Sequence, residues 1–148
     1  MKGFTLLEIL IVLSIVVILS AAGVSGYRTF GKSVEISSLT QSISAELRLM
    51  QAKSMSGESG LKWGVHFVNG ATDYYELFST PTDYASASTT VTATTTLPRN
   101  VSFLEPTSGQ SKDIIFNKIT GNTTATSVSI ISENVTKSIQ VTAIGTVD

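Results

Sequence analysis

The sequence predicts an α+β fold, in which one long N-terminal helix packs on a domain built from an antiparallel β-sheet. Residues 4–24 form an apolar run, and an apolar stripe of helical period continues to residue 50. From residue 62 onward, short β-rich segments alternate with turn residues, which is typical of antiparallel strands. The chain has 148 residues, a net charge of -1 and no cysteine, so we expect a single modest domain beside the helix and no disulfide.

The apolar run contains one acidic residue, Glu8. A helix over residues 4–24, rising about 1.5 Å per residue, would just cross a hydrocarbon core of roughly 30 Å. A carboxylate within such a span is costly unless it has a partner, so Glu8 is a candidate functional residue.

The segment Gly3-Phe4-Thr5-Leu6-Leu7-Glu8 resembles the processing site of type IV prepilins and type II secretion pseudopilins. The resemblance implies a pilin-like fold and cleavage by a membrane prepilin peptidase after Gly3, followed by N-methylation of Phe4. It also implies that Glu8 helps to dock the subunit into a filament. The implied partners are other pilin or pseudopilin subunits, the prepilin peptidase, the inner-membrane assembly platform and membrane lipid.

Elementary electrostatics agrees with this role for Glu8. A chain that begins at Phe4 carries a free amine, and the Glu8 of one subunit could neutralise the Phe4 amine of a neighbour within an apolar bundle. A simple signal anchor, with its glutamate near the membrane surface, is an alternative. A cleaved secretory signal is another, because residues 20–23 imitate its cleavage site, but its apolar region is usually only about 7–15 residues long.

We expect a leader at residues 1–3, a transmembrane and filament-core half of the helix at 4–30, an amphipathic half at 31–56 and a β-rich domain at 57–148. The helix should run from about residue 5 to 54 and stop near Gly57. Packing on a sheet is favoured over a free coiled coil because the remainder is rich in strands. The residues of the expected apolar stripe are Val34, Ile36, Leu39, Ile43, Leu47 and Met50.

The expected membrane exit contains Gly23, Gly26, Tyr27, Arg28 and Phe30. Glycine in a helix interior costs roughly 1 kcal/mol relative to alanine, so the helix could melt here on assembly, or the small residues could pack closely against neighbouring helices. Aromatic residues and a cation at this place are typical of membrane-interface anchors.

The strand pattern predicts a hairpin over residues 62–68 and 73–79, signalled by Asn69-Gly70. Trp63 and Phe67 should lie in the core, and His66 should face solvent or a neighbouring subunit. Residues 79–96 should form an exposed loop that leads into an edge strand over 89–97, since Pro98 ends it. Further strands are expected at residues 101–104, 113–117, 127–132, 138–142 and 143–147.

The residues support a structural subunit rather than an enzyme, because no nucleotide-binding loop, metal-ligand cluster or nucleophile triad is visible, and no cofactor is expected. Patterns beyond the N-terminus resemble the pseudopilin H and FimT-like branch, which suggests a minor pilin or pseudopilin. A DNA-binding minor pilin is the alternative, but the lysines are dispersed and nucleic acid is an unexpected partner. We expect a single-pass protein of the cytoplasmic membrane, with its C-terminal domain outside, that later enters a pilus or pseudopilus.

Overall fold

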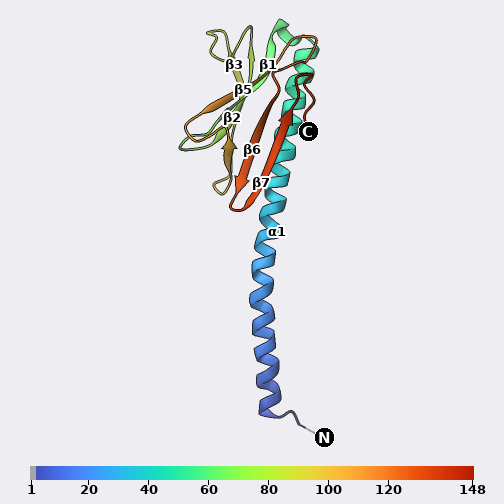
Figure 1. The fold of residues 1–148 in the computed structure, drawn as a ribbon, viewed down its shortest axis with the longest axis vertical. Coiled ribbons are helices and arrows are strands. Elements are labelled where there is room, and N and C mark those ends of the chain that lie inside the picture. Colours follow the sequence, from blue (N-terminus) through green and yellow to red (C-terminus); the bar gives the residue numbers. More distant parts are fainter. Residues whose placement is uncertain (1–2) are drawn as a thin grey trace. The chain divides into compact units, whose positions relative to one another are not determined.

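The computed structural model describes residues 3–148, although for residues 22–29 it describes the helical backbone and not the side chains. The chain divides into two compact units, residues 1–35 and residues 36–148. One α-helix, α1 (Leu6–Met55), contributes to both units, and seven β-strands follow it in the second unit (Figure 1).

The part of α1 in the second unit is amphipathic, as the sequence predicts. Ile36, Ile43, Leu47 and Met50 are each at most 2% exposed, and Leu39 packs against the same core. Val34 was expected on this stripe, but it is 52% exposed and belongs to the first unit. The helix ends near the predicted place, because Gly57 adopts φ 68° and its N–H bonds to the Ser54 carbonyl.

A buried serine anchors the end of α1. The Ser54 hydroxyl donates to the Phe116 carbonyl at 2.7 Å and accepts from the Trp63 N–H at 2.9 Å. The Ser54 carbonyl in turn accepts from the N–H of Ile119 at 3.0 Å. Lys53 lies over the Trp63 ring, 4.2 Å from its centroid, and pairs with Glu58 in the short 3-10 helix η1 (Glu58–Gly60).

The first sheet has four antiparallel strands in the order β3-β2-β1-β5. The predicted hairpin is confirmed as β1 (Lys62–Val68) and β2 (Tyr74–Thr80), and the predicted edge strand as β3 (Thr90–Thr96). β5 (Ser111–Phe116) forms the opposite edge. Position 64 in β1 has no room for a side chain, because a Cβ on Gly64 would lie 2.5 Å from the Ile114 carbonyl oxygen and 2.9 Å from the Phe78 ring.

The second sheet has three strands in the order β4-β6-β7, with β4 at Ser102–Glu105, β6 at Thr126–Ser132 and β7 at Val135–Val141. The prediction of a strand over residues 143–147 is wrong. The chain turns there, with the Gly145 N–H bonded to the Thr142 carbonyl, and only an isolated bridge joins Val147 to Val141. Gly145 adopts φ 85°, which is not a strand conformation, and so interrupts the run of β-branched residues that suggested a strand.

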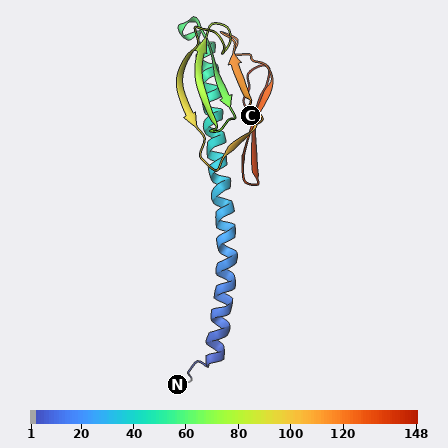
Figure 2. The same ribbon diagram turned by 90° about the vertical axis from the view of Figure 1, so that its left-hand side faces the viewer.

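Both sheets share one core with residues 36–55 of α1 (Figure 2). Trp63 and Phe67 lie in this core, as predicted, and they are 5% and 0% exposed. His66 was expected to face solvent or a neighbouring subunit, but its own chain covers it and it is only 8% exposed. It does lie on the opposite face of the strand, where the ring of Tyr84, from the loop after β2, stacks on the imidazole with 3.7 Å between centroids.

Candidate functional site

The peptide between Gly3 and Phe4 lies ahead of the first turn of α1. Residues 3–5 are not helical, and Phe4 is 77% exposed. A Cβ at Gly3 would meet nothing within 4 Å. Exposed, non-helical backbone of this kind is open to a protease.

Thr5 caps the helix immediately after this peptide. Its hydroxyl accepts from the Glu8 N–H at 3.3 Å, and its carbonyl accepts from the Ile9 N–H at 3.3 Å. Sequence reasoning did not assign this role to Thr5, although a threonine followed three residues later by glutamate is the capping-box pattern. The cap determines that Glu8 lies in the first helical turn, where the helix dipole favours a negative charge.

The Glu8 carboxylate is exposed and forms no ion pair or hydrogen bond within the part of the chain that the structure describes. Its surroundings are apolar: thirteen large hydrophobic side chains between residues 4 and 19 are exposed by 47–83%. A helix that is apolar all round is normally buried by a partner or by lipid. The Glu8 carboxylate is therefore a hydrogen-bond acceptor that lacks a donor and lies on an apolar surface.

The two serine hydroxyls on this helix surface are satisfied internally. The Ser14 hydroxyl donates to the Leu10 carbonyl at 2.8 Å, and the Ser20 hydroxyl donates to the Val16 carbonyl at 2.7 Å. Each serine therefore behaves as a small, nearly apolar residue towards a neighbour. Glu8 remains the one side chain of residues 4–21 with an unmet need for a hydrogen-bond donor.

The expected transmembrane segment is not confirmed. In the described part of the chain, no helix is both long enough and apolar enough to cross a bilayer. Of the residues expected at the membrane exit, Gly23, Gly26, Tyr27 and Arg28 lie outside the described side chains. Phe30, the fifth, is 69% exposed.

A polar cluster lies on the outer face of the first sheet and was not foreseen from the sequence. His66 Nδ1 bonds to Asp113 Oδ1 from β5, and the Tyr84 hydroxyl donates to Glu76 Oε2 of β2 at 2.5 Å. Burial, reinforced by the hydrogen bond to Glu76, raises the pKa of the Tyr84 hydroxyl. Since the loop that carries Tyr84 covers His66, the cluster holds this loop on the sheet.

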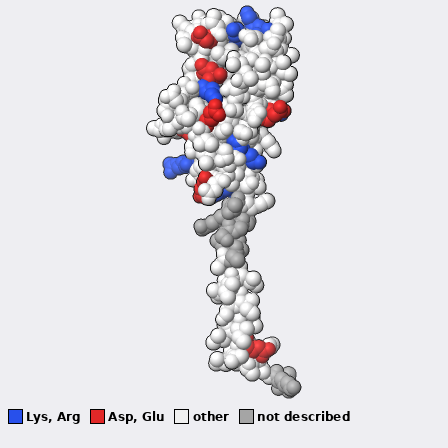
Figure 3. Space-filling model, in the orientation of Figure 1, with Lys and Arg blue, Asp and Glu red and all other residues white. Residues whose placement is uncertain are grey.

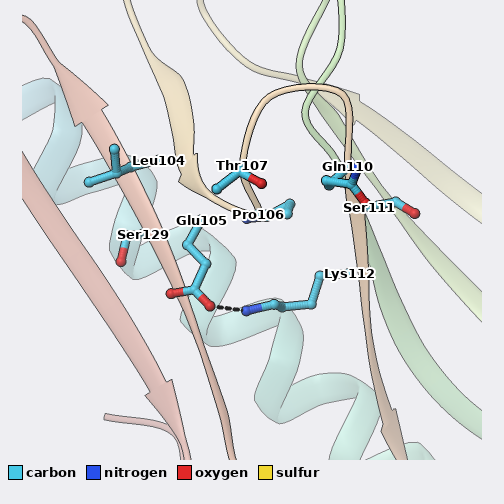
Figure 4. A pocket seen from close by; sticks show the side chains of 8 residues that line it. All are labelled: Leu104, Glu105, Pro106, Thr107, Gln110, Ser111, Lys112 and Ser129. Atoms are coloured by element: carbon cyan, nitrogen blue, oxygen red, sulfur yellow. Dashed lines mark hydrogen bonds and ion pairs between the residues drawn. The ribbon is translucent and has the colours of Figure 1, made fainter.

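A second polar group joins the two sheets and lines a shallow pocket between β4 and β5 (Figure 4). Lys112 of β5 pairs with Glu105 of β4 and donates to the Ser127 carbonyl of β6 at 2.9 Å. The hydrogen bonds from Lys112 and Ser127 lower the pKa of the Glu105 carboxyl. These contacts bind the sheets to each other.

No group of three or more His, Cys, Asp or Glu side chains is placed to hold a metal within the described residues. On the face of the second unit in Figure 3, basic and acidic side chains are interspersed. Several of the cations are engaged: Arg48 donates to the Val147 carbonyl and Lys118 to the Gly60 carbonyl, both at 2.8 Å.

Comparison with known proteins identifies the N-terminal segment. Residues 1–24 match the family described as the prokaryotic N-terminal methylation motif. No curated protein matches, and no solved structure matches. The resemblance to the pseudopilin H and FimT-like branch is therefore not confirmed. The motif, together with a long N-terminal helix on an antiparallel β-domain, supports a type IV pilin-like structural subunit that is processed by prepilin peptidase.

Proposed function

We propose that this protein is a structural subunit, of the minor pilin or pseudopilin kind, in a type IV pilus or a type II secretion pseudopilus. The prepilin peptidase cleaves after Gly3 and methylates Phe4, and the processed helix then joins a filament core. The observation that carries the proposal is the match of residues 1–24 to the methylation motif, and the exposed Gly3–Phe4 peptide directly before the Thr5 cap supports it.

Before assembly, residues 4–30 lie in the cytoplasmic membrane with the C-terminal domain outside. The exposed apolar side chains of residues 4–19 support this location, as do the internal hydrogen bonds of the Ser14 and Ser20 hydroxyls. Moving such a helix from lipid into a bundle of helices gains little from the hydrophobic effect, because lipid chains are as apolar as leucine side chains. A polar contact adds to the van der Waals packing that favours the bundle over the membrane.

Glu8 supplies this contact when a neighbouring subunit offers the amine of its processed Phe4. The Glu8 carboxylate has no partner within the described part of its own chain, so the pairing competes with no internal bond. Two charges that are each unfavourable in an apolar core become one hydrogen-bonded ion pair. Assembly with other subunits thus follows from cleavage, since only cleavage creates the amine at Phe4.

The pseudopilin H and FimT-like branch is the finer form of this proposal, and a DNA-binding minor pilin of an uptake filament is the alternative. Binding led by phosphate contacts needs a cluster of free cations. The engaged Arg48, Lys112 and Lys118 favour the structural subunit over the DNA receptor.

The experiment produces the full chain in cells that contain the prepilin peptidase and a pilus or pseudopilus. Intact mass should show loss of Met1, Lys2 and Gly3 and the gain of one methyl group. Gly3→Leu should leave the leader attached. Because the space around Gly3 is open, loss of processing in this variant reports on the peptidase rather than on folding.

Glu8→Gln keeps the shape of the side chain and removes its charge. We expect normal cleavage but at least about tenfold less protein in purified filaments, the factor that about 1.4 kcal/mol per subunit contact produces. Glu58→Gln, at an exposed position in η1, is the matched control and should assemble normally. Native protein that retains Met1, or Glu8→Gln that enters filaments like the wild type, overturns the proposal.

A further inference from the structure

The loop between β2 and β3, residues 81–89, is held on the first sheet at few points. At its base, the hydroxyls of Thr80 and Thr89 both donate to the Asp83 carbonyl, at 2.5 and 3.1 Å. Away from this base, and within the described part of the chain, Tyr84 provides the only hydrogen bond and ring contacts between the loop and the strands. The position of the β2–β3 loop therefore depends on Tyr84.

Three side chains of the sheet hold Tyr84. Its ring stacks on the His66 imidazole, with 3.7 Å between centroids and 6° between planes, and meets Phe78 edge-to-face at 4.9 Å. Its hydroxyl donates to Glu76 Oε2 at 2.5 Å. Burial and the bond to Glu76 raise the pKa of the Tyr84 hydroxyl, so it keeps its proton through neutral pH. A change in this contact near neutral pH must therefore come from the groups beneath the ring.

The titratable groups that face His66 are acids and phenols. His66 lies directly between Glu76 of β2 and Asp113 of β5, and its Nδ1 bonds to Asp113 Oδ1. Tyr74 lies diagonally opposite on β2, and Tyr84 covers the ring. In the described part of the chain, the other charged residues of these elements bond to none of these groups, and they are Lys62, Asp83 and Lys112. Only His66 can therefore supply a paired positive charge here.

Protonation of His66 changes two contacts at once. The imidazolium donates a charge-assisted hydrogen bond to Asp113 and places a cation against the face of the Tyr84 ring. A neutral imidazole can still donate to Asp113 from Nδ1, but it leaves two carboxylates without a cation and removes the cation–π attraction to Tyr84. The protonated form therefore holds the loop more firmly than the neutral form.

We propose that the β2–β3 loop is a pH-sensitive strap, which protonated His66 holds on the sheet through Tyr84. Histidine ordinarily changes charge between about pH 5 and 8, and carboxyl groups are ordinarily ionised above about pH 4–5. The contribution of the imidazolium is present in mildly acidic solution and is lost as pH rises through the histidine range. A loosened strap uncovers His66 on the outer face of β1. The device acts within one chain, so it does not depend on the proposed function.

Hydrogen exchange of the full chain in detergent measures the strap. Two amides of the loop report on it, because the Ser86 N–H bonds to the Asp83 carbonyl at 3.3 Å and the Thr89 N–H bonds to the Ser86 carbonyl at 3.0 Å. The turn over residues 107–110 is the matched control, since the Gln110 N–H bonds to the Thr107 carbonyl at 2.9 Å and lies outside the strap.

Wild type and His66→Gln are compared at the same pH, so that the intrinsic pH dependence of exchange cancels. Glutamine retains an N–H donor for Asp113 but cannot become a cation. At about pH 5.5, the loop of the wild type should exchange about two- to fivefold more slowly than that of His66→Gln, the factor that one cation–π contact produces. At about pH 8 the two rates should be equal. The control turn should give equal rates at both pH values.

A second variant and a direct titration complete the test. Tyr84→Ala should exchange rapidly in the loop at both pH values, and fluorescence of the buried Trp63 checks that each variant is folded. His66 is the only histidine, so its imidazole NMR signals show the pH range over which it changes charge. In the wild type, loop exchange relative to the control turn should rise over this same range. A ratio of wild type to His66→Gln that is equal at both pH values, or loosening outside this range, overturns the proposal.

Discussion

Replacement of Ser54 by alanine tests how the C-terminal part of α1 is held on the β-domain. The Ser54 side chain is fully buried, and its hydroxyl links the Phe116 carbonyl of β5 to the Trp63 N–H of β1. Alanine fits the same space but offers no hydrogen bond. Both backbone groups would then be buried without this partner.

The magnitude follows from these two groups. A buried donor or acceptor that loses its partner costs about 1–3 kcal/mol, so the two together set a range of about 2–6 kcal/mol. Small shifts of β1 and β5 recover part of this cost, and we expect a loss of about 2–4 kcal/mol in the free energy of unfolding. Ser56→Ala is the matched control, since the Ser56 hydroxyl is exposed and, among the residues that the structure describes, bonds only to the Lys53 carbonyl at 2.9 Å. Its expected change is within about 0.5 kcal/mol.

Urea unfolding of the full chain in detergent measures both variants. The only tryptophan, Trp63, is 5% exposed and lies beside Ser54, so its fluorescence follows the contact under test. The reasoning is refuted if Ser54→Ala unfolds within about 0.5 kcal/mol of the wild type, or if Ser56→Ala costs as much as Ser54→Ala.

Three further predictions concern the β-domain. Gly64→Ala should lower the free energy of unfolding by about 1–3 kcal/mol, because the added Cβ would overlap the Ile114 carbonyl. Gly70→Ala is the control and should change the free energy of unfolding little, because the nearest atom that a Cβ there would meet lies 3.9 Å away. Equal urea midpoints for the two variants would contradict this. The raised pKa of Tyr84 means that the folded chain holds the hydroxyl proton more tightly than the unfolded chain. Stability should therefore decline as pH rises above about 10, and Tyr84→Phe should decline less steeply in urea titrations at pH 9 to 11. Folding lowers the pKa of Glu105, so the pH dependence of its contribution to stability is opposite to that of Tyr84. This contribution is present above the unfolded pKa near 4.5 and is lost as pH falls through the lower folded pKa. Lys112→Met should therefore reduce the loss of stability between neutral and acid pH.

The sequence alone determined the elements that depend on local periodicity. The apolar spacing between Ile36 and Met50 predicted a helix with one buried face, and the pattern over residues 62–68 predicted a strand with Trp63 and Phe67 in the core. These predictions succeeded because burial of a face follows directly from a period of 3.6 or 2 residues. The N-terminal motif was equally visible, since its spacing lies within six consecutive residues.

Only the tertiary structure decided which polar residues are buried and how the strands divide between two sheets. His66 lies on the face that alternation predicts, yet Tyr84, eighteen positions later in the chain, covers it. Asn69, expected as a turn residue, is buried and caps β4 through carbonyls more than thirty residues away. Side-chain periodicity along one segment carries no information about which distant segment packs on it, because that choice depends on loop paths and strand order. The division into two sheets is a property of that order.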